Sequence, residues 1–144
     1  MATLNPYLNF NGNTEEAFNF YKSVFGGEFA MVQRFKDTPA ASNTPIKDLN
    51  KIMHIALPIG KGNILMATDA LESMGQKLMP GNNFHLSFSA DSEAETEKLF
   101  KGLSSGGNVM VPLSKQFWGA YFGMCTDKFG VQWMVSYDEN QQPK

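Results

Sequence analysis

Few side chains in this sequence could carry out chemistry: it contains two histidines, one cysteine and nine methionines. Residues 84–90 alternate between apolar and polar side chains, which predicts a strand with His85 and Ser87 on its polar face. An imidazole that faces a polar cavity can act as a general base or hydrogen-bond a ligand carbonyl. His85 is therefore the candidate catalytic residue. The alternative is a structural histidine that is hydrogen-bonded to Ser87 or to a backbone carbonyl.

The other reactive or aromatic side chains favour structural roles. His54 lies in a stretch that predicts a strand and corresponds to Phe122 in an internal repeat, so we expect a packing position. Cys125 lies mid-strand with no Lys or Arg nearby, and a single cysteine excludes an intrachain disulfide and a thiolate zinc site. Trp133 is expected in the core, whereas Trp118 is expected to be exposed in a loop, where it could stack on a planar ligand.

The elements that must position these residues form two similar halves. Residues 118–135 predict a hairpin of two strands, and residues 54–67 repeat it, with Met66 and Met134 lying 68 positions apart. Upstream, Leu8-Asn9-Phe10 matches Leu86-Ser87-Phe88. Each half predicts a strand, a helix and three further strands. Neither half is long enough to bury a stable core alone, so we expect the halves to fold as one domain, 1–144.

The first half opens with an alternating strand, residues 4–10, whose polar face should line a cavity. Asn13 followed by Glu16 predicts a capped helix that ends at Gly26-Gly27, with the Asn13 side chain accepting a first-turn amide and Glu16 reaching back. Residues 36–50 predict a long mobile loop, which is either a lid or a variable surface insertion.

The second half repeats this plan after a connection at 69–83 that we expect to contain one helical turn. Ser92 with Glu95 predicts a capped helix.

Composition excludes several classes of partner. The chain has 144 residues, 42% hydrophobic content and a net charge of −2, with twelve Lys and Arg spread along the sequence. This distribution has no basic stripe, so nucleic acid and anionic membranes are not expected partners. There is no apolar run of membrane-spanning length and no export signal at the N-terminus, so we expect a cytoplasmic protein.

Four short sequence motifs together resemble the PhnB-like branch of the glyoxalase, bleomycin resistance and extradiol dioxygenase superfamily (vicinal oxygen chelate). These motifs lie at residues 6–12, 17–27, 65–69 and 118–133. The resemblance covers nearly the whole chain. It implies an α+β fold of two βαβββ modules, here 1–69 and 84–138, each forming a curved mixed sheet around a cavity. It also implies a homodimer.

Metal-dependent members of that superfamily hold a divalent ion with His, Glu or Gln on the first and fourth strands of each module. Carried over by this resemblance, the four positions are Asn5, Met66, His85 and Met134. His85 alone is a normal ligand there, because thioethers suit Cu(I) and an amide oxygen is weak. We therefore expect no metal and no other cofactor. Some sequences of this branch are labelled 3-demethylubiquinone methyltransferases, but no glycine-rich turn for a nucleotide cofactor follows a strand here.

The resulting hypothesis is a protein of unknown specific activity that binds a small, mostly apolar, oxygen-bearing molecule in a metal-poor cavity. The alternative is a divalent-metal-dependent lyase, isomerase or dioxygenase of the vicinal oxygen chelate type. The residues expected to contact the ligand are Asn5, Tyr7, Asn9, Met66, His85, Ser87, Trp118, Gln132 and Met134.

Overall fold

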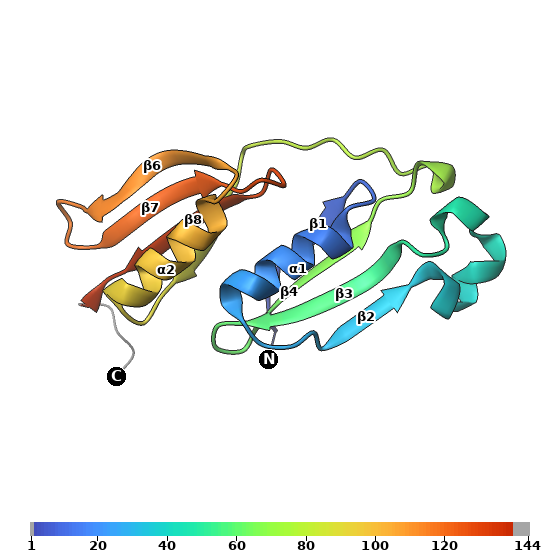
Figure 1. Cartoon of the computed structure of the whole chain (residues 1–144), viewed down its shortest axis with the longest axis horizontal. Helices are drawn as coiled ribbons and strands as arrows, with labels where there is room; N and C mark the ends of the chain where they lie inside the picture. The colour runs from blue at the N-terminus through green and yellow to red at the C-terminus, as the bar shows by residue number, and fades with distance from the viewer. Residues whose placement is uncertain (1, 140–144) are drawn as a thin grey trace. The chain divides into compact units, whose positions relative to one another are not determined.

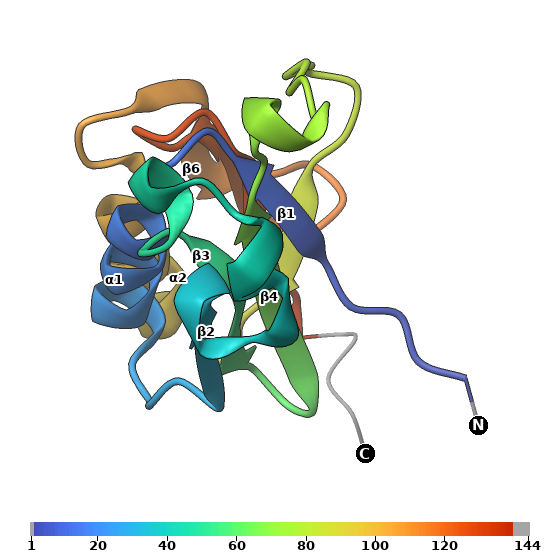
Figure 2. The ribbon, with the colours of Figure 1, turned by 90° about the vertical axis from the view of Figure 1, so that its right-hand side faces the viewer.

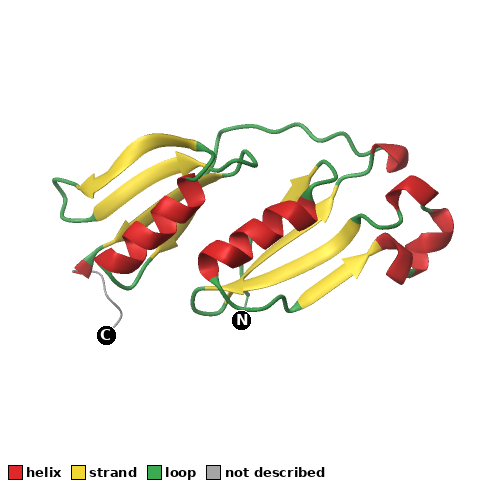
Figure 3. Cartoon of the chain, viewed as in Figure 1, coloured by secondary structure: helices red, strands yellow, loops and turns green. Residues whose placement is uncertain are grey.

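The computed structural model describes residues 2–139, which form two compact units that divide between residues 79 and 80. Each unit consists of one four-stranded mixed sheet with one α-helix across one face (Figure 1, Figure 3). The predicted α+β architecture of two βαβββ modules is therefore confirmed.

The N-terminal unit has the sheet order β1-β4-β3-β2, with β1 parallel to β4 and the other neighbours antiparallel. Its helix α1 lies against one face of the sheet, as Figure 2 also shows. The elements are β1 (Tyr7–Phe10), α1 (Thr14–Phe25), β2 (Met31–Arg34), β3 (Ile52–Ile59) and β4 (Asn63–Asp69), with short 3₁₀ helices η1 (Phe35–Asp37), η2 (Pro39–Asn43), η3 (Ile46–Asp48) and η4 (Glu72–Met74).

The C-terminal unit repeats this topology in the order β5-β8-β7-β6, with β5 parallel to β8. The elements are β5 (Leu86–Ser89), α2 (Glu93–Ser104), β6 (Asn108–Lys115), β7 (Tyr121–Thr126) and β8 (Gln132–Tyr137).

The core of each unit lies between the sheet and its helix. In the N-terminal unit, Leu8 and Phe10 are buried on the helix side of β1, whereas Tyr7 and Asn9 are exposed on the open side. In the C-terminal unit, Trp133 is 1% exposed, which confirms the predicted core position. This alternation follows from the two-residue period of a strand, and it leaves the opposite face of each sheet for other roles.

The two helices begin in different ways. The Ser92 hydroxyl accepts from the Glu95 amide at 3.0 Å, and the Glu95 carboxylate accepts from the Asp91 amide at 2.8 Å, so the predicted cap of α2 is confirmed. The predicted cap of α1 is wrong, because the Asn13 side chain makes no capping bond. The Thr14 amide and hydroxyl instead donate to Asp69 Oδ1 on β4, at 3.0 and 2.6 Å.

Residues 36–50, predicted as a long mobile loop, contain most of η1 and all of η2 and η3. Asp48 is 2% exposed and pairs with the Lys51 ammonium at 2.8 Å. This ion pair, between a buried carboxylate and a partly exposed ammonium, anchors the segment to the residue before β3. Whether the segment acts as a lid stays a prediction.

The sheet register corrects one detail of the repeat. Leu8 lies opposite Ala67 on β4, and Val135 is the residue of β8 that corresponds to Ala67. Phe88 lies opposite Val135, so Leu8 corresponds to Phe88, and the predicted match of Leu8 with Leu86 is wrong by two residues. The two-residue period keeps the faces unchanged.

Within the described range 2–139, no helix is both long and apolar enough to cross a membrane.

Candidate ligand-binding site

The open face of the N-terminal sheet carries a row of polar side chains from all four strands. Asn9 lies opposite Thr68 across β1 and β4, and Gln33 lies opposite His54 across β2 and β3. Cross-strand neighbours have side chains on the same face of a sheet. The row therefore runs across the width of the unit.

This row forms the floor of a cavity with a volume of about 500 Å³. That volume is within the range of small-molecule sites. Its walls come from η1, from the start of β3 and from the segment that follows β4. The lining residues are Tyr7, Asn9, Gln33, Phe35, Met53, His54, Thr68, Met74 and Gln76.

A β-bulge brings two consecutive residues of β3 to the cavity. Gln33 pairs with His54 but Arg34 pairs with Ile52, so Met53 is an extra residue in the ladder. Consecutive strand residues normally point to opposite faces, and a bulge changes the direction of one of them. Met53 and His54 consequently both line the cavity.

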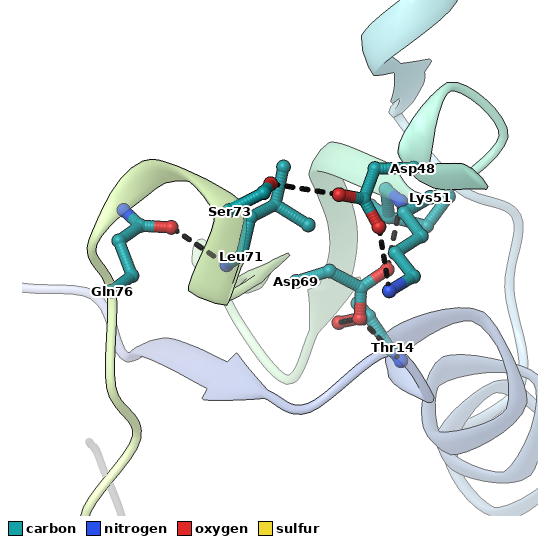
Figure 4. Close-up of polar contacts among 8 residues, drawn as sticks. Thr14, Asp48, Lys51, Asp69, Leu71, Ser73 and Gln76 are labelled. Atoms are coloured by element: carbon teal, nitrogen blue, oxygen red, sulfur yellow. Dashed lines mark hydrogen bonds and ion pairs between the residues drawn. The ribbon is translucent and has the colours of Figure 1, made fainter. Parts of the chain in front are cut away.

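Several polar groups of this lining have no hydrogen-bond partner within the described part of the chain. The side chains of Asn9, Gln33 and His54 make no hydrogen bond to any residue in 2–139. The His54 ring stacks on Tyr7 with ring centroids 5.8 Å apart. The Gln76 carbonyl oxygen accepts from the Leu71 amide at 2.9 Å (Figure 4), which leaves the Gln76 NH₂ group available to donate.

The wall that bears Met74 and Gln76 is anchored by the polar cluster in Figure 4. The Ser73 hydroxyl of η4 donates to Asp48 Oδ2 at 2.8 Å, and Lys51 pairs with the other carboxylate oxygen. The hydrogen bond from Lys51 lowers the pKa of the Asp48 carboxyl most, and the hydrogen bond from Ser73 lowers it further. The cluster joins η4 to the 36–50 segment and to Lys51, the residue before β3, so the wall that bears Met74 is held by contacts outside the cavity.

Of the expected ligand-contacting residues in this unit, Tyr7 and Asn9 line the cavity. Asn5 is already engaged, because its side-chain oxygen accepts from the Ile64 amide at 2.9 Å. Met66 lies opposite Tyr7 and is partly exposed on the same face. His54, which we expected to be a packing residue, is instead part of the cavity lining.

In the C-terminal unit the expected residues lie on or beside β5, β7 and β8. Ser87 lies opposite Met134 on the open face. The Gln132 side chain is 8% exposed and donates to the Phe84 carbonyl, so its amide ties β8 to the chain that enters β5. Trp118 is 52% exposed and lies edge-on to Phe122, with centroids 5.8 Å apart.

His85 has a distinctive environment. Its Nε2 atom is buried and has no hydrogen-bond partner among the residues that the structure describes. The expected structural alternative, a bond from this ring to Ser87 or a backbone carbonyl, is therefore not seen at Nε2. Buried polar atoms are rarely left unpaired in proteins, so this nitrogen has an unused capacity to bind.

The four superfamily ligand positions do not fit a hard divalent ion. Met66 and Met134 offer thioethers, and the Asn5 oxygen already accepts a backbone amide. No group of three or more His, Cys, Asp or Glu in the described part of the chain could hold a metal. Cys125 is fully buried. Its burial, and to a smaller extent the nearby Asp127 carboxylate, raises the pKa of the Cys125 thiol to about 11.

Comparisons with known proteins agree with this architecture. The chain is 29% identical to Protein YjdN of Escherichia coli (strain K12) over 146 residues, which covers 96% of this chain and 97% of that protein. A crystal structure of protein PA1353 from Pseudomonas aeruginosa is 40% identical, with a TM-score of 0.84, and covers 96% of this chain and 98% of the other.

A third relative is a Bacillus cereus structure described as a putative 3-demethylubiquinone-9 3-methyltransferase, PhnB protein. It is 26% identical, with a TM-score of 0.75, and covers 94% of this chain and 99% of that one. The sequence profile of the Glyoxalase/Bleomycin resistance protein/Dioxygenase superfamily matches residues 3–135. This chain, with its two βαβββ units, therefore belongs to the glyoxalase, bleomycin resistance and dioxygenase superfamily.

Proposed function

We propose that the chain binds a small, mostly apolar molecule that carries one or two oxygens, and that it does so without a metal ion. The observation that supports this proposal best is the cavity of about 500 Å³ in the N-terminal unit, with its unpartnered polar side chains. A cavity that mixes apolar walls with a few polar groups is typical of small-molecule sites.

We extend the proposal to the residues expected on the open faces. Tyr7, Asn9 and Met66 would contact the ligand in the N-terminal unit. Asn5 and Gln132 would act by holding neighbouring strands, since each side chain already bonds to backbone. His85, Ser87, Trp118 and Met134 would contact ligand in the C-terminal unit. Assembly as a homodimer and a cytoplasmic location are part of the same proposal.

A second candidate function is catalysis that depends on His85. The buried, unpartnered Nε2 atom favours it, because an imidazole nitrogen with no partner can accept a proton from a substrate. In this case His85 would be the catalytic residue, and a metal-dependent variant of the reaction would require an ion bound at His85.

A titration with acetophenone, which is mostly apolar and carries one oxygen, tests the first candidate. We expect the side-chain NH₂ signals of Asn9, Gln33 and Gln76 to shift in ¹H–¹⁵N spectra. Asn9→Ala should weaken binding by about tenfold, the effect of losing roughly one hydrogen bond. The matched control is Asn63→Ala, because Asn63 is also an exposed asparagine of this sheet but does not line the cavity.

Elemental analysis of protein purified without chelator separates the first candidate from the metal-dependent variant of the second. The first candidate predicts less than one equivalent of any divalent metal per chain. One equivalent that disappears in His85→Ala would support the second candidate and contradict the first. Equal binding of acetophenone by the Asn9 and Asn63 variants would also contradict the first.

A further inference from the structure

The polar lining of the N-terminal cavity contains no Asp, Glu, Lys or Arg. Three of its nine side chains are carboxamides, those of Asn9, Gln33 and Gln76, and they come from three different segments of the unit. A carboxamide offers both donors and an acceptor without a charge. This concentration of amides goes beyond what an apolar ligand requires.

Two charged residues that are close in sequence to the lining, Arg34 and Lys51, already have partners. The Arg34 guanidinium pairs with both carboxylate oxygens of Glu15. The Lys51 ammonium pairs with Asp48, which also accepts from Ser73. An ion in the cavity would therefore lose part of its hydration and would find no countercharge among the lining residues.

The amides present both kinds of hydrogen-bonding group. Gln76 can only donate towards a ligand, since its oxygen is occupied by the Leu71 amide. Asn9 and Gln33, at opposite ends of the polar row, can each donate and accept. A ligand that satisfies all three must carry an acceptor for the Gln76 NH₂ group and a donor for a side-chain oxygen.

The remaining lining suits a flat ring. Tyr7 and His54 are stacked with an interplanar angle of 29°, and Phe35 adds a third ring. Met53 and Met74 add polarizable thioethers, which contact aromatic rings favourably.

From these observations we propose that the cavity selects an uncharged aromatic ligand bearing a primary amide, a lactam or a similar group that both donates and accepts hydrogen bonds. This inference rests on the proposed binding function and adds the chemical class of the ligand. The amide or lactam group of the ligand forms hydrogen bonds with Asn9, Gln33 and Gln76. The aromatic ring of the ligand contacts Tyr7 and His54.

Three probes of nearly equal shape test the charge preference: benzamide, benzoate and benzamidinium, with acetophenone as the acceptor-only reference. Binding is measured by the shifts of the Asn9, Gln33 and Gln76 NH₂ signals during titration. We expect benzamide to bind more tightly than acetophenone. We expect both ions to bind at least about tenfold more weakly than benzamide, because each must be desolvated without a countercharge.

A single substitution should reverse this order. Gln33→Glu places a carboxylate in the cavity on the edge strand β2, and it should make benzamidinium the tightest of the three probes. Gln116→Glu makes the same chemical change at a partly exposed site of the C-terminal unit, outside the cavity, and should leave the order unchanged.

The outcomes separate the inference from the function on which it rests. Benzoate or benzamidinium binding to the unmodified chain as tightly as benzamide would overturn the inference, while acetophenone binding would still support the proposed function. An unchanged probe order in Gln33→Glu would also overturn it. Failure of all four probes to shift the cavity signals would overturn the proposed function and the inference together.

Discussion

Asp69 at the end of β4 should be one of the most important polar residues for the stability of the N-terminal unit. It is 2% exposed and accepts three hydrogen bonds, from the Thr14 amide, the Thr14 hydroxyl and the Ile52 amide, at 3.0, 2.6 and 2.8 Å. It therefore caps α1, joins the helix to β4 and holds the start of β3. The substitution Asp69→Asn removes the charge and one acceptor while keeping the size of the side chain.

The expected cost follows from these contacts. The remaining oxygen of an asparagine can still accept from Thr14, but its NH₂ group then faces the Ile52 amide, and two donors meet. A hydrogen bond to a charged group contributes about 1.5 to 3 kcal/mol. A negative charge at a helix N-terminus adds about 0.3 to 1 kcal/mol. We expect Asp69→Asn to lower the free energy of unfolding by about 2 to 4 kcal/mol.

The assay must separate the two units. Both tryptophans, Trp118 and Trp133, are in the C-terminal unit, so their fluorescence does not report on the N-terminal unit directly. Urea unfolding followed by far-ultraviolet circular dichroism gives the overall change. Hydrogen exchange of the α1 amides then assigns it, because these amides should lose protection first.

The control is Asp37→Asn, because Asp37 is an exposed aspartate of the same unit. Surface substitutions of this kind change stability by about 0.5 kcal/mol or less. If Asp69→Asn were as mild as Asp37→Asn, or if the α1 amides kept their protection, the reasoning that Asp69 caps the helix across the sheet would be refuted.

Two further predictions concern other buried contacts. At Gly123 on β7, a Cβ would lie 2.7 Å from Phe100 Cε1 and 3.0 Å from Leu113 Cα, so Gly123→Ala should destabilise the C-terminal unit by about 1 to 3 kcal/mol. Tryptophan fluorescence in urea measures this change, and the control is Gly81→Ala, where the atom nearest to the added Cβ is 4.0 Å away. Because the folded state lowers the pKa of Asp48, the stabilisation by this group is present above the ordinary pKa of an aspartate and is lost as the pH falls through the lowered value. The difference between the urea midpoints of wild type and Asp48→Asn should therefore be constant from pH 7 down to about pH 4 and should shrink as the pH falls further. A difference that stays constant below that pH would contradict the pairing with Lys51.

The helix caps indicate which local features the sequence could predict. The cap of α2 lies within five residues, Asp91 to Glu95, and the local pattern predicted it correctly. The pattern at Asn13 and Glu16 was equally suggestive, yet the acceptor for Thr14 is Asp69, 55 residues away in the chain. A contact of that range depends on the pairing of β1 with β4, and local spacing carries no signal for it.

The cavity shows the same limit. Alternation correctly predicted that Tyr7 and Asn9 face away from the helix. It could not predict that Met53 and His54 both line the cavity, since a bulge breaks the two-residue period. Phe35, Met74 and Gln76 were also missed, because they lie in segments without regular strand structure. The contributions of the C-terminal residues, including His85, stay predictions.

The register of the two sheets indicates how the duplicated halves have diverged in chemistry. The polar row of the N-terminal sheet contains Asn9 paired with Thr68 and His54 paired with Gln33. The corresponding pairs of the C-terminal sheet are Ser89 with Ser136 and Phe122 with Ser114. The second row therefore has short hydroxyl groups and a phenyl ring where the first has two amides and an imidazole. A hydroxyl can rotate to suit many partners, whereas a carboxamide is planar and presents its donors and acceptor in fixed directions. The groups suited to directional hydrogen bonding with a ligand are thus concentrated on the N-terminal sheet, although both sheets have the same strand order.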